Sequence, residues 1–230
     1  MFAVIFEVQP KRERWNDYLD LAKYLKPKLE ATDGFIDNER FESKRTKGRV
    51  LSLSAWRDEK ALVRWRTQGE HHGVQEKGRF EIFDDYHLRV GEVTDDSDPA
   101  RDQSTVQQRL DETANPEAKA ISITELMPPE GDKPKIAAKH LPAHLGLDIQ
   151  SVGLVDHEVF ESIYNPGKLL LLVTWRDAEP ARKWTPVATA DLGKLRHRRI
   201  RVIRDYGMTD RHEAPQFYPE VKRAHGVAAE

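Results

Sequence analysis

The chain has 230 residues, which is enough for one large domain or two small ones. Its 37 basic and 39 acidic side chains nearly balance, so no overall basic charge is available to attract nucleic acid or acidic lipid. The sequence contains no cysteine, and this excludes disulfides, thiolate metal sites and cysteine nucleophiles.

The N-terminal segment, Met1 to Glu7, has no basic leader of the kind that a signal peptide carries. No apolar run in the sequence approaches the roughly 18 residues of a membrane-spanning helix. We therefore expect a cytoplasmic protein that binds neither a membrane nor nucleic acid.

Apolar runs and helical spacing predict six elements in the first 93 residues. Strands are predicted at 2–9, 35–43, 49–56 and 80–92, and helices at 11–31 and from Asp58 through Trp65. In the third strand, Ser52 and Ser54 alternate with apolar residues, which is typical of a strand with one wet face. The order β-α-β-β-α-β is that of a ferredoxin-like unit.

The second half of the chain repeats the first. When residues 34–65 are laid over residues 153–184, thirteen of the 32 positions are identical, which indicates a tandem duplication. The second copy is predicted to have strands at 119–127, 153–163, 168–175 and 199–208, and helices near 133–145 and at 177–190. Towards its end the register slips by one residue, so that Arg79 and Tyr86 correspond to Arg199 and Tyr206.

The repeat predicts four parts of the chain. These are a first ferredoxin-like domain at 1–93, a polar linker at 94–118 with one or two helical turns around Thr105 to Leu110, a second domain at 119–211 and a tail at 212–230. Because each sheet would leave one apolar face open, we expect an α+β fold in which the two antiparallel sheets pack face to face into a pseudo-dimeric α+β barrel. The natural pocket would lie between the sheets, and a pocket in the first copy is the alternative. The chain would be a monomer with an internal pseudo-dimer, and further dimerisation is left open.

The first copy resembles the antibiotic biosynthesis monooxygenase family, whose members are dimeric α+β barrels. The matching residues are the segment LSLSAWRDE at 51–59 and Trp65, Arg66, His71, Gln75, Gly78, Arg79, Phe83, Asp85 and Tyr86. The resemblance implies that the chain is two fused copies of one family subunit. It also implies a small-molecule substrate and dioxygen, because some family members oxidise phenols or anthrones without metal or flavin.

The candidate catalytic residues are Trp65, His71, Arg79 and Tyr86. The resemblance places Trp65 beside a pocket, and His71 occurs in the first copy alone. A neutral imidazole can take a proton from a phenol or an activated C–H group, which cofactor-free oxygenation needs because the substrate itself must reduce dioxygen. Arg79 and Tyr86 are candidate donors to a developing oxyanion, although their recurrence in the second copy favours a structural role.

Other motifs carry less chemistry. His140 and His144 have the i, i+4 spacing of metal ligands, but Pro142 lies between them and no third ligand is evident. The basic run LRHRRIRVIR at 195–204 alternates with apolar residues like a strand with a wet face. Glycine-rich phosphate loops are absent from the sequence. We therefore expect no metal and no bound cofactor.

These observations predict a cofactor-independent monooxygenase that oxidises an aromatic small molecule (a phenol, an anthrone or a quinol-like compound) with dioxygen. Two alternatives stay open: a non-catalytic ligand-binding or stress-associated protein, and a haem-binding or haem-degrading relative. The family resemblance implies that a haem-degrading enzyme has an Asn on its first strand and a His on its second helix. Here the first strand, Phe2 to Gln9, contains no Asn, and Gln75 stands where that His would be.

Overall fold

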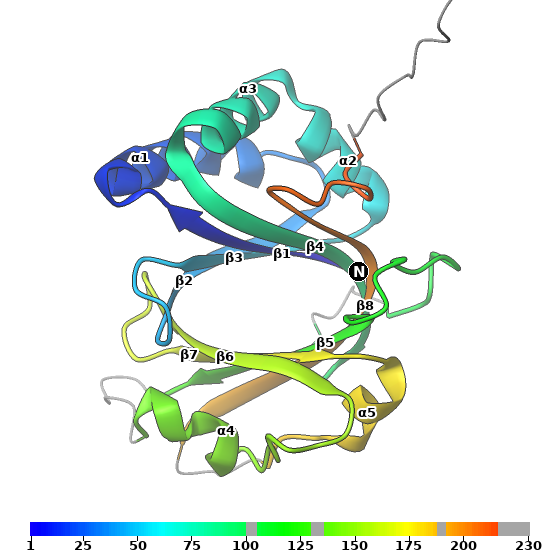
Figure 1. Ribbon diagram of the computed structural model, residues 1–230. Helices are drawn as coiled ribbons and strands as arrows, with labels where there is room; N and C mark the ends of the chain where they lie inside the picture. Colours follow the sequence, from blue (N-terminus) through cyan, green and yellow to red (C-terminus); the bar gives the residue numbers. More distant parts are fainter. Residues whose placement is uncertain (100–104, 130–135, 188–191, 216–230) are drawn as a thin grey trace, which may run out of the picture.

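The computed structural model describes residues 1–99, 105–129, 136–187 and 192–215. In this part of the chain the strands form one closed antiparallel barrel, and the helices cover its outside (Figure 1). None of the described helices is long and apolar enough to cross a membrane.

The first copy forms one half of the barrel. Its strands are β1 (Phe2–Pro10), β2 (Phe35–Ser43), β3 (Val50–Trp56) and β4 (Phe83–Asp96), and its helices are α1 (Trp15–Glu30), α2 (Glu59–Thr67) and α3 (Gly69–Lys77). A 3-10 turn at Arg12–Arg14 precedes α1, and a π-helical turn at Gly78–Ile82 leads into β4. Asp58 begins α2 as predicted, because its Oδ1 accepts a hydrogen bond from the Ala61 N–H at 2.8 Å.

The second copy forms the other half. Its strands are β5 (Ala120–Met127), β6 (Leu154–Ser162), β7 (Leu169–Trp175) and β8 (Lys194–Gly207), and its helices are α4 (Leu141–His144), preceded by a 3-10 turn at Ala138–His140, and α5 (Ala178–Lys183). These helices are much shorter than those of the first copy, as Figure 1 shows below the lower sheet.

The two copies share a helix–sheet contact that depends on glycine. Gly34 and Gly153 precede β2 and β6 with left-handed φ values of 85° and 89°. A Cβ atom at Gly34 would lie 2.5 Å from the Cβ of Ala61, and one at Gly153 would lie 2.7 Å from the Cγ of Pro180. Only glycine therefore allows the helix after the third strand to pack this closely in either copy.

The strand order around the barrel is β1-β3-β2-β6-β7-β5-β8-β4, which confirms the α+β fold of two ferredoxin-like sheets packed face to face. The copies join where β2 pairs with β6 and where β4 pairs with β8. The interior is filled by a buried apolar cluster to which all eight strands contribute, including Ile5, Phe41, Leu53, Val93, Ile121, Phe160, Leu172 and Val202. The expectation of the main pocket between the sheets is therefore wrong, because apolar side chains occupy that space.

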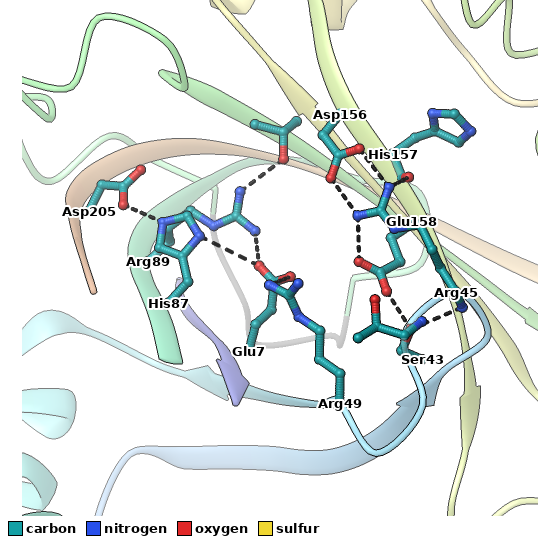
Figure 2. A network of polar contacts seen from close by, with 12 residues as sticks. Glu7, Ser43, Arg45, Arg49, His87, Arg89, Asp156, His157, Glu158 and Asp205 are labelled. Carbon is teal, nitrogen blue, oxygen red and sulfur yellow. Dashed lines mark hydrogen bonds and ion pairs between the residues drawn. The ribbon is translucent and has the colours of Figure 1, made fainter. Parts of the chain in front are cut away.

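A network of polar contacts connects the two copies (Figure 2). The Arg89 guanidinium on β4, only 3% exposed, donates to the Glu7 carboxylate on β1 and, at 2.9 Å, to the Thr174 hydroxyl on β7. The Nε2 of His87 lies 2.5 Å from the Asp205 carboxylate on β8. The Arg89–Thr174 and His87–Asp205 contacts join residues of the first copy to residues of the second.

A second set of contacts lies beside the first in Figure 2. The Arg45 guanidinium, just beyond β2, lies 2.8 Å from the carboxylates of both Asp156 and Glu158 on β6. The Ser43 hydroxyl donates to the same Glu158. Of these charged groups only the Glu158 carboxylate is buried, and removing Arg45 would leave that charge without its cationic partner, so the contact helps to fix how the two halves meet.

Several predicted boundaries are wrong around β4 and β8. Phe80 and Ile82 belong to the π-helical turn rather than to a strand, and the Phe80 side chain is 69% exposed. The strand starts at Phe83 instead, while β8 begins five residues earlier than predicted, at Lys194. An alternation of apolar and polar residues over three positions fits a turn as well as a strand, which explains the first error.

The predicted helices of the second copy and the linker also differ from the structure. The helix expected at 177–190 ends at Lys183, with residues 188–190 outside the described part, and the helix expected near 133–145 covers only 138–144, with 133–135 outside it. Thr105 to Leu110 form no helical turn. The helix α3, which carries His71, is an element that the sequence analysis missed.

The strand pairing corrects the alignment of the last strands. Phe2 on β1 pairs with Glu92, and the equivalent Ala120 on β5 pairs with Arg201. Arg201 is therefore the counterpart of Glu92, and by the same register Tyr86 corresponds to Leu195 rather than to Tyr206. The expected recurrence of Arg79 and Tyr86 in the second copy is wrong, because the second copy lacks the segment that forms α3 and the π-helical turn in the first.

Candidate active site

A cavity of about 710 Å³ lies between the helices of the first copy and the outer face of its sheet. All the helices of this copy, α1, α2 and α3, contribute to its wall, and the outward-facing side chains of β1 to β4 form its floor. Most of the lining is apolar, including Val4, Phe6, Leu21, Ala22, Leu25, Leu29, Leu62, Val63, Val74, Phe83, Leu88 and Val90. Such a cavity suits a small, largely apolar organic molecule.

A chain of polar contacts crosses the floor of this cavity. The Asn38 side-chain amide donates to the Ser52 hydroxyl at 3.0 Å, and the Arg40 guanidinium donates to the Asn38 Oδ1 at 3.1 Å. Ser52 and Ser54 thus form the wet face that the alternation predicted, but this face lies under the helices and lines the cavity. Burial raises the pKa of Tyr18 above the same floor, and the nearby Arg40 opposes that effect.

Trp65 and His71 form one stacked pair in the cavity wall. Their ring centroids are 4.2 Å apart with an interplanar angle of 19°, and Trp65 also stacks on the buried Trp56 at 6.5 Å. The His71 Nδ1–H donates to the Trp65 carbonyl at 3.0 Å, which leaves the Nε2 of the neutral ring as an acceptor. Burial lowers the pKa of His71 to about 4, so the ring is neutral at physiological pH.

The position of His71 is set by its neighbour Glu70. The Glu70 carboxylate accepts hydrogen bonds from the Tyr24 hydroxyl at 2.8 Å and from the Lys28 ammonium at 3.0 Å. Both partners belong to α1, so Glu70 fixes the start of α3 against that helix. The π-helical turn then returns the chain to β4 below His71.

Arg79 and Tyr86 line the same cavity as Trp65 and His71. The Arg79 guanidinium lies over the Phe80 ring at 5.3 Å, and the Tyr86 hydroxyl accepts a hydrogen bond from Arg211. The structure thus places all four candidate residues on one cavity, and it brings two of them, Trp65 and His71, into direct contact.

The sequence analysis missed the arginines at the β8 side of the cavity. Arg66 on α2, Arg204 on β8 and Arg211 beyond β8 all line the cavity, and all three act on the Tyr206 hydroxyl. Burial and the neighbouring Tyr86 raise the pKa of Tyr206 to about 12, and the three guanidinium groups oppose this rise. Arg204 on β8 of the second copy pairs with Val90 on β4 of the first copy. The second copy therefore contributes part of the wall of the first copy's cavity.

The same space is filled in the second copy. Three polar cavity positions on β2 and β3, Arg40, Ser52 and Ser54, align with apolar residues in the repeat. Their counterparts are Val159, Leu171 and Val173, which all belong to a buried cluster with Leu141, Leu145, Trp175 and Trp184. These exchanges are visible in the aligned sequences, so comparing the copies position by position would have located the floor of the cavity.

A smaller, polar cavity of about 260 Å³ lies at one end of the barrel interior. Its charges pair with one another, since the Lys168 ammonium lies 2.5 Å from the carboxylates of both Glu39 and Glu125, and Arg198 also binds Glu125. Neither His140 nor His144 lines either of these two cavities, and no group of three or more His, Asp or Glu side chains in the described residues could hold a metal ion.

The fold and this cavity define the class of protein: an α+β barrel with a hollow, helix-covered face. Residues 1–77 match the sequence model of the family described as "Antibiotic biosynthesis monooxygenase". The "Jasmonate monooxygenase ABM" of Pyricularia oryzae is 42% identical over 224 residues, which cover 95% of this chain and 99% of that protein. The "Uncharacterized protein YqjZ" of Bacillus subtilis is 30% identical over 92 residues, which cover 40% of this chain and 78% of that protein.

The chain belongs to the antibiotic biosynthesis monooxygenase family. It is accordingly classed as an oxidoreductase of the monooxygenase type, with a small-molecule substrate and dioxygen. Among solved structures, an aldoxime dehydratase with 12% sequence identity covers 87% of this chain and 80% of its own, with a TM-score of 0.56. At this identity the likeness concerns the fold alone.

Proposed function

We propose that the chain is a monooxygenase that oxidises a small, largely apolar molecule with dioxygen in the cavity of the first copy, without metal or flavin. The observation that supports this most is the cavity of about 710 Å³ with the Trp65–His71 pair in its wall. A protein that kept this fold only for stability would be expected to fill the space, as the second copy does.

The proposed reaction of an aromatic substrate balances without a reductant. When an anthrone CH₂ group reacts with dioxygen to give a C=O group and water, all the electrons come from the substrate carbon. The substrate must first become an electron-rich anion, and the Nε2 of neutral His71 is the acceptor for its proton. Because the pKa of His71 is lowered to about 4, His71 is a weak base, and the cavity arginines are proposed to stabilise the anion that it helps to form.

A second substrate class is favoured by one observation, the similarity over 95% of the chain to a protein called a jasmonate monooxygenase. Jasmonate is a small carboxylic acid with an apolar ring and chain, and the cavity has the size and lining for it. Hydroxylation of such a molecule, R–H to R–OH with release of water, consumes two electrons beyond those of the substrate. This reaction would therefore require a reductant such as a reduced nicotinamide, whereas anthrone oxidation would not.

Oxygen consumption tests the proposal. The purified protein would be mixed with an anthrone or hydroquinone alone, and with jasmonate in the presence and absence of reduced nicotinamide. We expect uptake with one of these substrates, and a loss of kcat of about a hundredfold in His71→Ala. His144→Ala, which removes an exposed histidine of the second copy, is the matched control and should retain full activity. No uptake with any substrate, or equal rates for the protein and His71→Ala, would contradict the proposal.

A further inference from the structure

The cavity of the first copy carries more positive than negative charge. Its charged lining residues are the cations Lys26, Arg40, Arg66, Arg79, Arg204 and Arg211 and the acids Glu59 and Glu76. Glu59 is already engaged, because both of its oxygens accept hydrogen bonds from Arg109 at 2.6 Å. The acids of the lining therefore leave most of the cationic groups without a counter-charge.

None of the five arginines of this lining, among them Arg66 and Arg204, forms an ion pair with any of the described residues. The Nε of Arg66 is buried and has no hydrogen-bond partner in this part of the chain. Arg204 and Tyr206 lie two residues apart on the cavity face of β8, and Arg66 on α2 lines the same cavity, so these groups come from two elements that enclose it. A buried N–H group without an acceptor is costly, which favours an anion beside the Arg66 Nε when the site is in use.

The lining beside these arginines is apolar. Trp65 precedes Arg66 on the same helix and packs with Leu62 and the partly buried Val90 and Leu25. A ligand with an ionised group at the arginines would therefore place its hydrophobic part against Trp65 and His71. The cavity thus places cationic side chains beside an apolar surface, as expected for a ligand that is itself amphipathic.

We propose that the part of the cavity lined by Arg66, Arg204 and Tyr206 is a carboxylate-binding subsite, so that the substrate is an organic acid with an apolar ring or chain. The guanidinium group suits this role because its parallel N–H groups match the two oxygens of a carboxylate. The Tyr206 hydroxyl, whose raised pKa keeps it protonated, supplies a further donor. The inference rests on the proposed function, since it names the substrate class of the same cavity.

The test compares an acid with its neutral ester. Binding of naphthylacetate and of its methyl ester would be measured by isothermal titration calorimetry, without any turnover. We expect the protein to bind the acid about tenfold or more tightly than the ester, since hydrogen bonds to charged groups are the stronger kind. Arg66→Met and Arg204→Met should lose this preference because their affinity for the acid falls while their affinity for the ester does not. Arg66→Lys should recover part of the preference.

Arg64→Met is the matched control, because Arg64 lies on the same helix but points to Asp33 at the surface. It removes the same charge and should leave the preference unchanged. Equal binding of acid and ester, binding of neither, or equal weakening of both in Arg66→Met would overturn the inference. If the inference fails in this way, oxygen uptake with an ester substrate would still support the proposed function. Conversely, a binding preference for the acid without any turnover would support the carboxylate-binding subsite and contradict the monooxygenase reaction.

Discussion

The two copies share one backbone plan but use the space beneath their helices in opposite ways. In the first copy, α1 to α3 cover a cavity of about 710 Å³, whereas in the second the short α4 and α5 lie on a packed apolar cluster. The exchange of Ser52 for Leu171 at equivalent positions of β3 and β7 illustrates the difference. The duplicated unit thus keeps an open cavity in one half and a packed core at the equivalent place in the other.

Each copy nevertheless places a histidine against its helix tryptophan. His71 stacks on Trp65 at 4.2 Å, and His197 meets Trp184 edge-on at 5.3 Å. His197 comes from β8, is only 3% exposed, and uses its Nδ1 in a hydrogen bond of 2.8 Å with the Thr124 hydroxyl. The same pair of residue types is therefore part of a cavity wall in one copy and part of a core in the other.

The largest effect on stability is expected when a core residue of the second copy is replaced by the residue at the equivalent position of the first copy. Leu171 is fully buried, so Leu171→Ser removes its apolar contacts and places a hydroxyl in the core. We expect the free energy of unfolding to fall by about 3–5 kcal/mol, measured by urea denaturation. Leu171→Ile is the control and should cost less than about 1.5 kcal/mol. A loss below about 1 kcal/mol for the serine variant would show that the second copy is not tightly packed.

The reverse exchange should affect activity instead of stability. Ser52→Leu puts the residue of the packed copy on the cavity floor, while Asn38 keeps its hydrogen bond of 3.0 Å to the Leu53 carbonyl. We expect turnover to fall by about tenfold or more because the side chain occupies substrate space, with a free energy of unfolding equal to or above that of the parent. Ser52→Thr, which keeps the hydroxyl, should retain most of the turnover. Unchanged kinetics in Ser52→Leu would mean that the substrate lies elsewhere.

The smallest effect concerns pH. Burial lowers the pKa of both His71 and His197 to about 4, whereas an unfolded histidine titrates near 6.5. Between these values the unfolded chain binds protons that the folded chain does not, so stability should fall as the pH decreases from about 7 to about 5. Urea denaturation of His71→Phe and His197→Phe at these two pH values would show a smaller decrease than the parent. If the variant that carries both changes lost as much stability between about pH 7 and about pH 5 as the parent, other titratable groups would be responsible for the loss.

The sequence predicted the barrel well because the duplication carries long-range information. Thirteen identities between the copies fixed equivalent strands, and two equivalent sheets with open apolar faces have few ways to bury them. Helix ends in the second copy were less predictable. There, Pro180 stands where the first copy has Ala61, a good helix former, and Pro142 lies within the short α4; the described residues between α5 and β8, 184–187 and 192–193, form no helix.

The location of the cavity was not predictable from alternation alone. The pattern of Ser52 and Ser54 shows that one face of β3 is polar, but it does not distinguish a face in solvent from one beneath helices. Arg66 and Arg204 lie 138 residues apart in the sequence, and only the pairing of β4 with β8 brings them to the same cavity. Trp65 and His71, in contrast, are close in sequence and were identified from it.

The most direct test of the account is a crystal structure of the protein with substrate bound in the absence of oxygen. We predict that the substrate lies in the first copy beneath α1 to α3, against Trp65 and His71, with the cavity floor at Ser52 below it. Substrate bound in the polar cavity beside Lys168 and Arg198, or beneath the helices of the second copy, would contradict the division into a reactive and a structural half.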